Sequence, residues 1–152
     1  MVAELQLIKA TTQHPGYQEL VPLLDAELRV RDGDDHAFYA QYNKSDSIHH
    51  VIVAMLFENA VGIGAFKEYE KGVAEIKRMY VLPEYRGQGI AMQVLASLEE
   101  WARENNYPRC ILETGIHQPE AIRLYKKCGY TVIPNYGQYA GVEESICMEK
   151  FV

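Results

Sequence analysis

The stretch EIKRMYVLPEYRGQGIA, residues 75–91, decides how the rest of the chain is organised. Apolar and β-branched residues over 73–82 predict a strand, and Pro83 ends it because proline cannot donate to a sheet ladder. The two glycines of the following RGQGIA segment can adopt backbone conformations closed to other residues and let a ligand approach closely. The helix that begins there has unpaired N–H groups and a positive dipole end, which favour a bound phosphate. Arg86 adds a fixed fork of donors, so the segment suits a diphosphate.

Two other phosphate-binding patterns are excluded by the residues at this position. A Rossmann fingerprint needs a third glycine, and Met92 stands there instead. A P-loop needs Gly-Lys-Ser/Thr after a longer gap, and the chain contains no such run. What remains is an R-x-x-G-x-A segment that follows a strand ending in V-L-P.

The length and composition of the chain predict one globular domain. The 152 residues, 48% of them apolar, can fill a single core, and we assign residues 1–152 to one domain. No apolar run approaches the ~20 residues of a membrane span, and the N-terminus lacks the pattern of a secretion signal. Three widely spaced cysteines, without metal-ligand spacing, favour a reducing, cytoplasmic location.

The charge of the chain is unevenly distributed. The net charge is −6, from 15 basic and 21 acidic residues, and all of this excess lies in residues 1–76. A general nucleic-acid binder would carry the opposite sign, so we expect neither a nucleic-acid nor a membrane partner. The acidic half could attract a cationic small molecule such as an amine, or it could serve only to keep the protein in solution.

Hydrophobic periodicity and turn residues give the expected order of the elements. We expect strands over 4–8, 50–57, 61–70, 73–82, 110–114, 130–133 and 145–151, and helices over 14–31, 35–42, 89–105 and 118–128, with a turn at 43–47 and Asp35 as the cap of the second helix. Short loops predict an antiparallel meander over 50–82, and the strand–helix–strand unit over 73–114 predicts a right-handed parallel crossover. The fold class is therefore α/β, with a twisted mixed sheet of about seven strands and helices on both faces, in the order β-α-α-β-β-β-α-β-α-β-β.

A second segment, QPEAIRLYKKCGY over residues 118–130, together with the R-x-x-G-x-A segment, closely resembles the GNAT superfamily of acetyl-CoA-dependent N-acetyltransferases. The resemblance follows the family's N-x-x-A-x-x-L-Y-x-x-x-G-F/Y pattern, except that Gln118 stands where the family usually has asparagine. It implies acetyl-CoA as the acetyl donor, and it implies no metal. The implied cofactor-binding residues are Met79, Tyr80 and Val81 through their backbone, the loop of Arg86, Gly87, Gln88, Gly89, Ile90 and Ala91, and Gln118 and Tyr125.

The resemblance also gives Tyr125 a role as general acid. A phenol with a pKa near 10 can donate a proton to the departing thiolate at physiological pH. The alternative is that Tyr125 is only a core aromatic on its helix.

An amine must lose a proton before or during attack, so a base is needed. Glu75 is the first candidate because some GNAT enzymes place a glutamate there, and it could instead pair with Lys77 or Arg78. Glu113, at the end of the next parallel strand, is the second candidate. His49 and His50 are unsuited to one metal site because adjacent strand residues point to opposite faces.

These observations predict an N-acetyltransferase that passes an acetyl group to a primary amine of a small molecule or peptide by direct attack in a ternary complex. Alternatives are a non-catalytic CoA-binding sensor or interaction module, or transfer of a longer acyl group. Candidates for the acceptor site are Tyr39, Tyr42, Tyr136, Tyr139, Asp32, Asp34 and Asp35, since aromatic and acidic side chains can surround an ammonium group. The apolar last strand suggests a homodimer.

Overall fold

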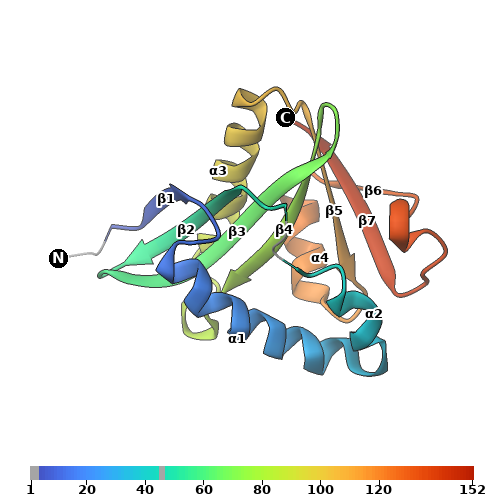
Figure 1. Cartoon of the computed structure of the whole chain (residues 1–152), viewed down its shortest axis with the longest axis horizontal. Helices are drawn as coiled ribbons and strands as arrows, with labels where there is room; N and C mark the ends of the chain where they lie inside the picture. The colour runs from blue at the N-terminus through green and yellow to red at the C-terminus, as the bar shows by residue number, and fades with distance from the viewer. Residues whose placement is uncertain (1–3, 45–46) are drawn as a thin grey trace.

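The computed structural model describes residues 4–44 and 47–152, so residues 1–3 of the assigned domain and residues 45–46 of the predicted turn lie outside the described part. Its described residues form one mixed sheet in the order β1-β2-β3-β4-β5-β7-β6 (Figure 1). The strands are β1 (Gln6–Ala10), β2 (His50–Leu56), β3 (Asn59–Glu70), β4 (Val73–Val81), β5 (Arg109–Gly115), β6 (Thr131–Ile133) and β7 (Ser145–Phe151). The helices are α1 (Pro15–Asp32), α2 (His36–Ala40), α3 (Ile90–Glu104) and α4 (Pro119–Lys127), with 3-10 turns at Gly33–Asp35, Pro83–Tyr85 and Gly137–Tyr139. The predicted element order and fold class are confirmed.

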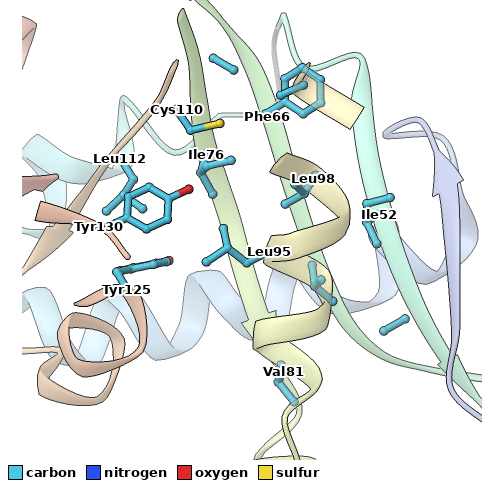
Figure 2. Packing of buried hydrophobic residues seen from close by; sticks show 14 of the residues in the cluster. Ile52, Phe66, Ile76, Val81, Leu95, Leu98, Cys110, Leu112, Tyr125 and Tyr130 are labelled. Carbon is cyan, nitrogen blue, oxygen red and sulfur yellow. The ribbon is translucent and has the colours of Figure 1, made fainter. Parts of the chain in front are cut away.

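Helices cover both faces of the sheet because the strands alternate their apolar side chains between two cores. On one face, α3 and α4 pack on the sheet around Leu95, Leu98 and Leu112 (Figure 2). On the other face, α1 packs Leu20 and Leu24 against β2 and β3. A third cluster joins α2 to the segment before β7 on the α1 face. None of the described helices is both long enough and apolar enough to cross a bilayer.

The second helix differs from its prediction. The segment begins as a 3-10 turn at Gly33–Asp35, and the α-helix covers only His36–Ala40. Asp35 does not cap it with its side chain, because its φ of −87° and ψ of 2° are close to helical values. A capping residue needs an extended backbone for its side chain to reach the free N–H groups.

The apolar last strand, from which a homodimer was predicted, lies inside the sheet. β7 is placed between β5 and β6 and is hydrogen-bonded on both sides. Met148 is fully buried in the α3 face of the core. The edge strand is β6, which has only three residues. The homodimer stays a prediction, and β7 offers no free strand edge to a second copy.

Candidate active site

The sheet is split between its two parallel strands. In the described chain, β4 and β5 pair only through Val73–Arg109, Ala74–Cys110 and Glu75–Ile111. Beyond that point β4 continues to Val81 and β5 to Gly115, and the two strands no longer pair with each other. The carboxyl ends of the two strands therefore diverge, and ligands of open α/β sheets bind at such a place.

A cavity of about 100 Å³ lies at this split. The lining residues come from α1, α2, both parallel strands, the start of α4 and the segment before β7. They include all three residues predicted to act in catalysis, together with Gln118 and Met79; the full set is Leu24, Leu28, Asp32, Tyr39, Asn43, Glu75, Ile76, Lys77, Arg78, Met79, Glu113, Thr114, Gly115, Gln118, Tyr125 and Tyr139.

A β-bulge in β4 shapes one wall of the cavity. The register with β3 shifts between Ile63 and Ala65, whose partners are Tyr80 and Lys77, so Arg78 and Met79 together face one residue. Arg78 has a φ of 59°, which is uncommon for a residue with a side chain. The extra residue reverses the alternation of side chains beyond it. As a result Met79 packs on the α3 face while Tyr80 packs against α1.

Glu75 lies buried on the α1 face, with one oxygen hydrogen-bonded and a lysine near the other. The hydroxyl of Tyr136 donates to Glu75 Oε2 at 2.7 Å, and Lys77 Nζ lies 3.9 Å from Oε1. The sequence suggested Lys77 or Arg78 as an ion-pair partner of Glu75, and the structure shows the pair with Lys77. Arg78 instead donates to Asp25 Oδ1 on α1 at 2.7 Å.

Glu113 is the less constrained of the two carboxylates. Its Oε2 atom is buried and has no hydrogen-bond partner among the described residues. Burial raises the pKa of Glu113 from 4.5 to about 7, and the Ser145 hydroxyl and Lys77 oppose that rise. A carboxyl group with a pKa near neutrality can accept and release a proton at physiological pH.

Tyr125 reaches the cavity from the opposite face of the sheet. Its ring packs in the core between α4 and α3, edge-on to Tyr130 (Figure 2). The two ring centroids are 5.9 Å apart. The same residue lines the cavity that holds Glu113. Burial, reinforced by Glu113, raises the pKa of the Tyr125 phenol, which therefore stays protonated and able to donate. Tyr125 is thus both a core aromatic residue and a residue of the cavity wall.

The glycine loop between β4 and α3 has the backbone geometry needed to approach a ligand. Gly87 and Gly89 both have a φ of 80°, and an added Cβ at either would meet no atom within 4 Å. Gly89 is the N-cap of α3 and offers no side-chain cap. The N–H groups of Gly89, Ile90, Ala91 and Met92 precede the first helical hydrogen bond, so they are available to an anion.

Arg86 is directed towards α1 rather than across the loop. Its Nε donates to the Val81 carbonyl at 2.8 Å and its Nη2 to Glu27 Oε1 at 2.9 Å. Its guanidinium lies 5.4 Å from the ring centroid of Tyr80. Nε and Nη2 are thus hydrogen-bonded within the protein, and Nη1 donates to neither Val81 nor Glu27. The carbonyl of Val81, predicted to bind the pantetheine arm, is occupied by this residue.

Gln118 stands at the N-cap of α4 and lines the cavity. Its backbone oxygen accepts from Ala121 and Ile122, while its side chain makes no capping bond to the helix. The amide is therefore free of a structural role at the helix end and available within the cavity.

The predicted acceptor residues separate into two groups. Tyr39, Tyr139 and Asp32 line the cavity. Tyr42 and Tyr136 pack beside Tyr39 and Tyr139 in the third cluster, which joins α2 to the segment before β7. Asp34 and Asp35 are exposed. His50 stacks on Phe66, with 4.4 Å between ring centroids, and His49 is exposed. Within the described residues, no group of three or more His, Cys, Asp or Glu side chains could hold a metal ion.

Lys77, Ser145 and Glu27 belong to the site and were missed as functional residues. Lys77 Nζ donates to the Tyr42 carbonyl at 2.8 Å, and Ser145 Oγ lies 2.9 Å from the Tyr39 hydroxyl. Alternation along β4 could have placed Lys77 beside Glu75 on the same face. Nothing in the sequence signals Ser145 or Glu27, because their partners lie far away in the chain.

A split mixed sheet, a glycine loop that opens a helix, and a cavity with acidic and phenolic groups define an acyl-transferring enzyme, and comparisons with known proteins agree. The model of the Acetyltransferase (GNAT) family matches residues 17–130. The chain therefore belongs to the GNAT family of acetyltransferases.

Individual relatives carry related names. An IAA acetyltransferase from Azospirillum brasilense is 37% identical over 100 residues, which cover 65% of this chain and 65% of that protein. The chain thus spans less than two thirds of this relative's length. A Klebsiella pneumoniae structure described as an acyl-CoA N-acyltransferase is 30% identical, with a TM-score of 0.80 and 97% of each chain covered.

A structure with the donor bound also shares the fold. The GNAT family acetyltransferase from Elizabethkingia anophelis, with acetyl-CoA bound, has a TM-score of 0.70 and covers 97% of this chain and 98% of that one. Its sequence identity is 18%, so this likeness concerns the fold alone.

Proposed function

We propose that this enzyme transfers an acetyl group from acetyl-CoA to a primary amine of a small molecule or peptide, by direct attack in a ternary complex. The observation that carries the proposal is the single cavity at the split of the sheet. Tyr125 enters it from the α4 face, and Glu75 and Glu113 lie on the α1 face. An acid and a base on opposite sides of one reacting centre are what acyl transfer to an amine needs.

The residues around the split fit acetyl-CoA. The free N–H groups at Gly89, Ile90, Ala91 and Met92 would hold the diphosphate, with Arg86 Nη1 as an additional donor. When bound, acetyl-CoA supplies an acyl group activated as a thioester. Met79 lines the cavity beyond the last residues that β4 and β5 pair, and its backbone N–H would hydrogen-bond to the acyl oxygen as that atom gains charge.

Proton transfer is assigned to two residues. Glu113 would take the proton from the amine, because it lines the cavity, has one oxygen without a hydrogen-bond partner among the described residues and has a pKa near neutrality. Glu75, the first candidate from the sequence, would orient the acceptor, since the Tyr136 hydroxyl already donates to its Oε2 atom and Lys77 lies near its Oε1 atom. Tyr125 would donate its proton to the leaving thiolate, and no cysteine among the cavity-lining residues offers an acyl-enzyme route.

A screen of primary amines with acetyl-CoA tests this function. Amino acids, diamines, aminoglycosides and lysine peptides are compared by release of free CoA thiol, and acetylated product is verified by mass spectrometry. Transfer to at least one amine, with a higher melting temperature in acetyl-CoA than in acetate, is the expected result. Acetyl-CoA binding without turnover on any amine would favour the sensor module, and turnover only with longer thioesters would favour a different acyl group.

A further inference from the structure

The charged side chains that line the cavity do not balance. Five of them are present: Asp32, Glu75, Lys77, Arg78 and Glu113. Both cations already have carboxylate neighbours, since Lys77 lies near Glu75 and Arg78 forms an ion pair with a residue of α1. The two remaining carboxylates, Asp32 and Glu113, form no salt bridge with any described residue.

These two carboxylates come from different elements, and the charge of Asp32 acts on Glu113. Asp32 ends α1 and Glu113 lies near the end of β5. Burial is the first cause of the raised pKa of each, and Asp32 adds to the rise at Glu113. Four other charged or titratable groups act on Asp32. His36 and His117 lower its pKa, and Asp35 and Glu144 raise it. A bound cation would relieve the cost of burying these charges.

The walls of the cavity also suit a cation better than an anion. Tyr39 and Tyr139 are both buried and line it, and aromatic faces attract ammonium groups. The Tyr39 hydroxyl is fixed by Ser145 at 2.9 Å. Lys77 Nζ donates to the Tyr42 carbonyl at 2.8 Å and lies 3.9 Å from Glu75 Oε1, so its charge is already shared with two oxygens of the protein.

We infer that the acceptor is a small amine that carries a second positive charge, with one ammonium group at Asp32 and the reacting amine at Glu113. The inference rests on the proposed function, because it names the acceptor class of the same site. A cavity of about 100 Å³ holds only a short chain, as each water-sized group needs ~10–15 Å³ of such space. Short straight-chain diamines match this description, whereas amino acids would bring a carboxylate against Glu113 and Asp32.

The test compares three matched acceptor sets at saturating acetyl-CoA. Straight-chain diamines of increasing length, the monoamines of equal length and the corresponding diamino acids are each measured for kcat/KM. We expect the best diamine to exceed its monoamine by ~10-fold or more, since a charge-assisted hydrogen bond to Asp32 is gained. The diamino acids should be poorer than the diamines.

Two variants separate the inference from a general charge effect. Asp32→Asn should lower kcat/KM for the diamine through KM and bring the diamine-to-monoamine ratio close to one. Glu19→Gln removes a charge from an exposed position of the same helix and should keep the ratio. Melting temperature and acetyl-CoA affinity, measured for both, show whether either variant is misfolded.

Each outcome decides between the two proposals. Equal turnover of diamines and monoamines, or an unchanged ratio in folded Asp32→Asn, overturns the dicationic acceptor and leaves the transferase intact. A preference for diamino acids overturns it too, and would point to the buried, unpartnered Nε of Arg78 as a carboxylate contact. Failure of every amine despite acetyl-CoA binding overturns the proposed function and the inference with it.

Discussion

The hydroxyl oxygen of Tyr136 lies 2.7 Å from Glu75 Oε2, and this hydrogen bond links the segment before β7 to the middle of the sheet. Burial, followed by the charge of Glu75, raises the pKa of Tyr136, so the phenol remains the donor. One oxygen of Glu75 is therefore occupied, while one oxygen of Glu113 in the same cavity has no partner. The two glutamates should respond differently to mutation.

Glu113→Gln should lower kcat by ~10²–10⁴-fold, the usual contribution of a general base. The loss should be largest where the amine is protonated and smaller at high pH. For the wild type, kcat/KM should rise as pH increases through about 7, because Glu113 must be ionised to accept a proton. Steady-state rates from pH 5.5 to 9.5 check this. A severe loss in Glu75→Gln with little effect of Glu113→Gln would return the role of base to Glu75.

The same substitution should stabilise the folded protein at alkaline pH. The pKa of Glu113 is about 7 in the folded state against 4.5 in the unfolded chain, so folding favours the protonated carboxyl group. That contribution is complete below pH 4.5 and is lost as pH rises through 7. We expect Glu113→Gln to raise the free energy of unfolding by about 1–3 kcal/mol at pH 8. Urea unfolding should show a clearly larger gain at pH 8 than at pH 5, and an equal effect at both would contradict the prediction.

Tyr125→Phe should reduce turnover while acetyl-CoA affinity stays near that of the wild type. The ring keeps its packing against Tyr130, and only the hydroxyl that protonates the thiolate is removed. An interaction made mainly in the transition state affects kcat rather than KM. A thioester with a better leaving group should restore the rate. If the variant retains full activity with acetyl-CoA, Tyr125 has only a packing role.

Gly89→Val should abolish the rise in melting temperature caused by acetyl-CoA. Gly72→Val is the matched control, because Gly72 has the same φ of 80° but lies at the turn between β3 and β4. Each variant should lose about 1–2 kcal/mol from left-handed backbone strain. Only the first should lose the ligand-induced shift, which follows from binding to the folded state. Equal shifts in the two variants would remove the loop from the donor site.

The homodimer can be tested at the exposed end of the last strand. Phe151 is 71% exposed, and Val132 on β6 is 58% exposed. A dimer that forms at this end of the sheet would bury these two side chains. Light scattering should give twice the monomer mass, and Phe151→Lys should shift it towards the monomer. A wild-type monomer at working concentration would exclude the dimer.

The sequence predicted features that are encoded locally. Periodicity fixed the order of the elements, and the R-x-x-G-x-A segment located the loop whose glycines at positions 87 and 89 have positive φ. Local pattern could not reveal the bulge at Arg78, because a strand with an extra residue has no distinct composition. The contacts Tyr136–Glu75 and Glu27–Arg86 join residues 61 and 59 positions apart, and only the tertiary structure brings them together.

The two sides of the split between β4 and β5 are built from different parts of the sequence. The side that would hold the donor is built from the end of β4, the glycine loop, α3 and α4. These all lie within residues 73–127, a stretch that also contains β5. The opposite wall comes from α1, α2 and the segment before β7, at the two ends of the chain. We therefore expect substitutions in those terminal segments to change which acceptor is used while the donor side stays the same. This separation lets substrate range diverge during evolution without rebuilding the chemistry.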